Sequence, residues 1–72
     1  MFNILAVGNN TFIIIKENDI EDKSYGSIRI SKFNNTYGVS LNAISDEVYR
    51  SGEKKKLEDK AIEIVKAYLN NI

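Results

Sequence analysis

Two pairs of adjacent asparagines constrain the fold of this chain more than any other feature. Asn9-Asn10 and Asn34-Asn35 each lie between runs rich in β-branched and apolar residues. Asparagine tolerates positive φ better than most residues, and a pair of turn residues between two such runs is typical of a β-hairpin. The sequence therefore predicts two hairpins, over residues 2–17 and 26–43, joined by a polar loop over residues 18–25.

The second hairpin has one clear register. With Asn34-Asn35 at the turn, Ile30 lies opposite Val39 and Ile28 lies opposite Leu41, so one face is apolar. Serine, arginine and asparagine side chains alternate onto the other face. This pattern predicts a hairpin with a core side and a solvent side.

The first hairpin is ambiguous, because both of its faces carry large apolar side chains. A turn at Asn9-Asn10 pairs Val7 with Phe12, whereas a turn at Gly8-Asn9 shifts the pairing by one register step. The first register puts Leu5, Val7, Phe12 and Ile14 on one face and Ile4, Ala6, Ile13 and Ile15 on the other.

The remaining third of the chain is predicted to be helical. Ser45 followed by two acidic residues is typical of a helix start, and we expect a short helical turn over residues 46–50. Ser51-Gly52 breaks it, and an amphipathic helix is expected over residues 53–70. A continuous helix from residue 46 is the alternative. At 100° per residue, the apolar stripe consists of Leu57, Ala61, Ile64, Val65, Tyr68 and Ile72.

These elements predict an α+β fold with the order ββββα in a single domain over residues 1–72. Two antiparallel hairpins form one sheet, and the C-terminal helix packs on one face. A helix of about 18 residues is roughly 27 Å long and covers only that face. The far face of the first hairpin is then covered by a curled sheet with the Ile20 loop or residues 44–49, by a second copy in a homodimer, or by another protein.

Composition excludes several classes of chemistry. The 72 residues include no His and no Cys, which removes thiolate and imidazole catalysis and Cys/His metal sites. We expect no catalytic, cofactor-binding or metal-binding residue, and a protein that is not an enzyme. The absence of cysteine and of any leader or membrane span predicts a cytoplasmic protein. Many Ile, Asn and Lys residues suggest a low-GC bacterium, a phage or another mobile element.

The favoured functional hypothesis is a small protein-binding module, such as an inhibitor or accessory protein, that docks through an apolar sheet face or edge. Its interaction residues are predicted to be Ile4, Phe12, Ile13, Ile14 and Ile15.

Charged residues supply further candidate contacts and the alternative hypotheses. The acidic candidates are Glu17, Asp19, Glu21 and Asp22, and the basic ones are Arg29, Lys32, Lys54, Lys55 and Lys56. The basic set suggests nucleic-acid binding as the alternative function, although the net charge of +0 does not favour it. A small ligand carrier or enzyme is the remote alternative.

Overall fold

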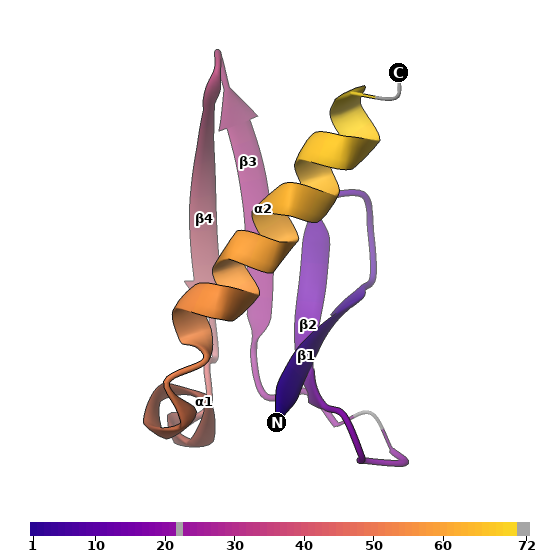
Figure 1. The fold of residues 1–72 in the computed structure, drawn as a ribbon, viewed down its shortest axis with the longest axis vertical. Coiled ribbons are helices and arrows are strands. Elements are labelled where there is room, and N and C mark those ends of the chain that lie inside the picture. The colour runs from indigo at the N-terminus through magenta and orange to yellow at the C-terminus, as the bar shows by residue number, and fades with distance from the viewer. Residues whose placement is uncertain (22, 71–72) are drawn as a thin grey trace.

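The computed structural model of the chain describes residues 1–21 and 23–70. Four strands form one antiparallel sheet in chain order, and α2 crosses one face of that sheet diagonally (Figure 1). The predicted α+β arrangement of two hairpins and a C-terminal helix is confirmed. The elements are β1 (Phe2–Ala6), β2 (Thr11–Lys16), β3 (Ser27–Phe33), β4 (Thr36–Asn42), α1 (Asp46–Ser51) and α2 (Lys54–Asn70).

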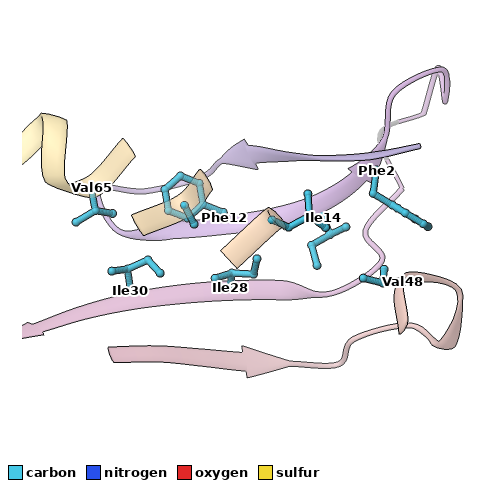
Figure 2. Packing of buried hydrophobic residues seen from close by; sticks show 9 residues of the cluster. Phe2, Phe12, Ile14, Ile28, Ile30, Val48 and Val65 are labelled. Carbon is cyan, nitrogen blue, oxygen red and sulfur yellow. The ribbon is translucent and has the colours of Figure 1, made fainter. Parts of the chain in front are cut away.

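The hydrophobic core lies between the sheet and the helices. The two central strands supply four side chains that are each 1% exposed, and α2 covers them with one row of small and medium apolar residues. Figure 2 shows how these side chains point towards one another from the strands. The buried residues are Phe2, Phe12, Ile14, Ile28, Ile30, Val48, Leu57, Ala61 and Val65.

The second hairpin has the predicted register. Ile30 pairs with Val39 and Ile28 pairs with Leu41, around a turn in which Asn34 adopts a φ of 58°. Only this register turns the isoleucines of β3 towards the core and leaves the polar residues outside. Burial therefore selects it.

The first hairpin has a register that neither predicted turn produces. Ile4 pairs with Ile14 and Ala6 pairs with Phe12, so the prediction that Val7 pairs with Phe12 is wrong by one residue. Because both faces are apolar, the burial pattern alone could not select the register. The two strands are instead joined by a longer loop over residues 7–10, closed by a 2.9 Å hydrogen bond from the Val7 amide to the Thr11 carbonyl.

This difference recombines the two predicted faces. Phe12 and Ile14 share the core side with Phe2 and Ile4 of β1. The opposite side carries Leu5 with Ile13 and Ile15.

Local signals mark the ends of α1. The Ser45 hydroxyl accepts a 3.2 Å hydrogen bond from the Glu47 amide, as an N-cap does. Gly52 ends the helix with a φ of 74°, which confirms the break at Ser51-Gly52. The alternative of a continuous helix from residue 46 is therefore wrong.

The buried side of α2 is rotated from the predicted stripe. Leu57, Ala61 and Val65 are buried as expected, but Ile64 and Tyr68 are 41% and 49% exposed. Ile62, on the other flank, packs against the core instead. The predicted stripe would need the sheet to cover the helix equally along its length, whereas the helix crosses the sheet diagonally (Figure 1). Ile72 lies outside the described residues.

Candidate functional site: the open face of the sheet

The face of the sheet opposite α2, here called the open face, carries apolar side chains that no helix covers. Side chains alternate along a strand, so Leu5 of β1 and Ile13 and Ile15 of β2 point away from the core formed by Phe12 and Ile14. Leu5, paired with Ile13, is 41% exposed, whereas Ile13 and Ile15 are half-buried by their neighbours on this face. The β1–β2 side of the open face is therefore a small apolar surface.

The β3–β4 side of the open face is polar. Arg29 lies at its centre, paired with Thr11 on one side and Ser40 on the other. All four strands are fully described, and Arg29 is the only charged strand residue whose side chain alternates onto this face. Serine and asparagine side chains surround it, and Phe33, 79% exposed, ends the row. The open face thus combines an apolar area with a polar area that contains one arginine.

The structure divides the five predicted interaction residues between two faces. Phe12 and Ile14 are each 1% exposed and lie in the core, and half-buried Ile4 packs against it. Only Ile13 and Ile15 are on the open face. Leu5, which belonged to the other predicted face, joins them because of the one-residue difference in register. Phe33 was missed, although the alternation that places Arg29 on this face extends to it.

Those of the acidic residues after β2 that the structure describes lie in or beside a turn. The Glu21 amide donates a 3.1 Å hydrogen bond to Oδ1 of Asp19, and Glu17 is exposed. Asp22 lies outside the described residues. Over residues 1–21 and 23–70, no three acidic side chains are grouped so that they could hold a metal ion.

The basic residues do not form one patch. Arg29 is on the open face, whereas Lys32 is paired with Tyr37 on the helix side of the sheet. Lys54, Lys55 and Lys56 begin α2, at the end of the sheet away from the β3–β4 turn (Figure 1). Two of them are engaged along the helix, Lys54 with Glu58 at 3.4 Å and Lys55 with Asp59 at 2.9 Å. This arrangement gives no continuous track for a phosphate backbone.

A pocket of about 480 Å³ lies at the N-terminal end of β1. The amine of Lys16, which lines it, is already paired with Glu47. Nζ of Lys16 lies 2.8 Å from Oε2 of Glu47 and 5.1 Å from the centroid of the Tyr25 ring. The hydrogen bond and the charge of Glu47 raise the pKa of Lys16. The pocket is lined by Met1, Lys16, Asn18, Asp19 and Tyr25.

Comparisons with protein-family models, with curated proteins and with solved structures find no match to this chain. None of the helices in the described part of the chain has the length and apolar character needed to span a membrane.

Proposed function

We propose that this chain is a small protein-binding module that docks onto another protein through the open face of its sheet. The observation that carries the proposal is the apolar surface formed by Leu5, Ile13 and Ile15, on the side of the sheet that α2 does not cover. The other side of the same strands already holds the core. Burying apolar area of this kind against a partner removes it from water and so favours binding.

The chemistry of the open face defines the partner. An apolar protein surface would fit against Leu5 and Ile13, and an acidic group beside it would pair with Arg29. Arginine contributes strongly to interfaces because its planar guanidinium makes two parallel hydrogen bonds to a carboxylate. The serines and threonine around Arg29 supply a polar rim.

The proposal is tested by charging the open face without touching the core. Leu5→Lys places an amine on a side chain that is already 41% exposed, and long lysine side chains keep their charged end in water. Ile20→Lys is the matched control, because Ile20 is 99% exposed and lies in the loop after β2. Both tagged variants and the unmodified protein are used to capture partners from a host lysate, with and without nuclease.

We expect a stoichiometric protein to be captured by the unmodified chain and by Ile20→Lys, to survive nuclease, and to be lost with Leu5→Lys. Far-UV circular dichroism must show that Leu5→Lys keeps its fold. Equal capture by all three proteins would overturn the proposal. Partners that disappear on nuclease treatment would favour the nucleic-acid alternative instead.

A further inference from the structure

The two edges of the sheet differ in how their outward-facing backbone groups are satisfied. At the β1 edge, the Phe2 amide donates a 3.2 Å hydrogen bond to Oε1 of Glu53, and the Ile4 amide donates a 2.9 Å hydrogen bond to Oδ1 of Asn3. Nζ of Lys60 also donates to that Asn3 oxygen, at 2.6 Å. A strand arriving at β1 would have to displace these groups, so this edge is protected.

The β4 edge is open. The Ile30 amide donates to the Asn10 carbonyl, and the Ile30 carbonyl accepts from the Asn10 side-chain amide. In β3, the backbone groups of even-numbered residues therefore point towards β2, and those of odd-numbered residues point towards β4. The β4 residues paired with the odd-numbered residues of β3, such as Gly38 and Ser40, direct their backbone amide and carbonyl groups to β3. Their neighbours Tyr37, Val39 and Leu41 therefore present amide and carbonyl groups at the free edge. Within residues 1–21 and 23–70, no side chain is hydrogen-bonded to these three amides.

β4 also lacks the usual features that prevent edge pairing. Its seven residues, TYGVSLN, contain no charged side chain and no proline, and every one of them has a single partner on β3, so the strand contains no bulge. No element lies beyond β4 on its outer side along most of its length (Figure 1).

We propose that β4 pairs with β4 of a second copy of this chain, antiparallel, about a two-fold axis at Val39. In that register, Val39 lies opposite Val39 of the other copy and Tyr37 lies opposite Leu41. The free backbone amides and carbonyls of these three residues in one copy then form hydrogen bonds with those of the same three residues in the other copy. The free edge is complementary to itself because its unpaired backbone groups are arranged symmetrically about Val39.

Charge supports a second copy in this orientation. Nζ of Lys32 and Nζ of Lys66 lie 5.9 and 5.5 Å from the centroid of the Tyr37 ring, at one end of the edge. The Leu41 end leads into α1, whose first turn carries Asp46 and also Glu47, which is already paired with Lys16. Antiparallel pairing brings the basic end of one copy towards the acidic end of the other.

This inference is independent of the proposed function, because it uses a different surface. Pairing along β4 would join two sheets into one, with the helices of both copies on the same face. Both open faces would then lie together on the opposite side, with their apolar areas at the two far ends.

Sedimentation equilibrium and an inward-pointing charge test the dimer. We expect the unmodified chain to show twice its monomer mass of 8.2 kDa at micromolar concentrations. Val39→Lys places a cation at the two-fold axis, opposite its own copy, and should raise the dissociation constant by at least about tenfold. Leu5→Lys adds the same charge on the opposite edge strand and should leave the mass unchanged, even if it abolishes partner binding.

Cross-linking tests the register and does not depend on how Val39→Lys folds. The chain contains no cysteine, so each introduced thiol is unique. In the proposed register, residue 38 faces residue 40 of the other copy with Cα atoms about 4.5 Å apart, whereas the two copies of residue 40 are about 7–8 Å apart. Gly38→Cys mixed with Ser40→Cys should oxidise to a disulfide dimer, and Ser40→Cys alone should not.

Two results would overturn the proposal. One is a monomer mass for the unmodified chain throughout the micromolar range. The other is a dimer in which the mixed cysteine variants cross-link no faster than Ser40→Cys alone, which would place the contact elsewhere.

Discussion

Gly26 is the residue whose identity the fold requires most strictly. It lies in a bulge in which Tyr25 and Gly26 together oppose Ile14, with hydrogen bonds of 2.8 and 2.9 Å. Its φ is 135°, and a Cβ built on it would lie 2.6 Å from Cδ1 and 2.9 Å from Cα of Ile44. The glycine therefore lets the connection from β4 to α1 pass directly against the end of β3.

We predict that Gly26→Ala destabilises the protein far more than Gly52→Ala. At Gly26, left-handed strain of about 1–3 kcal/mol adds to overpacking against the Ile44 backbone, and we expect a total of about 2–4 kcal/mol. Gly52 also has positive φ, at 74°, but a Cβ there meets nothing within 4 Å, so only about 1 kcal/mol is expected. Urea denaturation measures both losses. Similar losses at the two positions would show that the Ile44 contact contributes nothing.

We predict that Ala43→Gly stabilises the protein. Ala43 has a φ of 54°, a conformation that costs an L-residue about 1–2 kcal/mol, and glycine removes this cost while adding roughly 0.4–1 kcal/mol of unfolded-state entropy. The net gain should be about 0.5–1 kcal/mol, seen as a rise of several degrees in the thermal midpoint. A lower midpoint would indicate that the Ala43 methyl group makes a contact that outweighs the strain.

Neither residue could be identified from the sequence. A glycine after a polar loop is compatible with an ordinary turn, and nothing near it indicates that the chain returns at Ile44. The requirement for a residue without a side chain arises only when β3 and the start of α1 are brought together by the topology.

The two hairpins show why elements of similar sequence differ in predictability. In the second, Arg29 and Ser40 mark the solvent side, so only one register buries Ile28 and Ile30. In the first, Ile13 and Ile14 are equally apolar, and moving the register by one residue exchanges one buried side chain for another. The loop over residues 7–10 determines that register, through backbone geometry that side-chain hydropathy does not encode.

The ion pair between Lys16 and Glu47 connects β2 to α1 and should make stability depend on pH. Oε2 of Glu47 lies 2.8 Å from Nζ of Lys16, and this hydrogen bond and charge lower the pKa of Glu47. A carboxyl whose pKa is lower in the folded state stabilises the fold above its ordinary pKa. That contribution is lost as the pH falls through the lowered value.

We therefore predict that Glu47→Gln lowers the thermal midpoint at pH 7, and that this difference shrinks as the pH falls below the ordinary pKa of a glutamate. The effect should be small, because both side chains are largely exposed to solvent. The control compares the thermal midpoint of Lys16→Met with that of the double variant Lys16→Met/Glu47→Gln. These two midpoints should be nearly equal, because Glu47→Gln should have little effect once Lys16 is absent. A pH-independent difference would show that the effect does not come from the charge of Glu47.

At the scale of the whole molecule, the sequence predicted that one helix cannot cover both faces of the first hairpin. That argument needed only the apolar content of residues 2–17 and the length of one helix. It could not say which residues form the uncovered side. Phe12 and Ile13 are both large and apolar, and they point to opposite faces of the sheet only because side chains alternate along the strand. The candidate site was thus predictable as a surface but not as a set of residues.

The hydrogen bond between Glu53 and Phe2 links the start of α2 to the start of the sheet, 51 positions apart. Detachment of α2 would therefore remove Glu53 and Lys60 from the β1 edge and uncover the core face of the sheet at the same time. In that partly unfolded state the β4 edge is open, the β1 edge has lost two contacts and the core face lacks α2, which favours association between chains. The docking of α2 protects the β1 edge and covers the core at the same time, so a single helix controls two routes to aggregation.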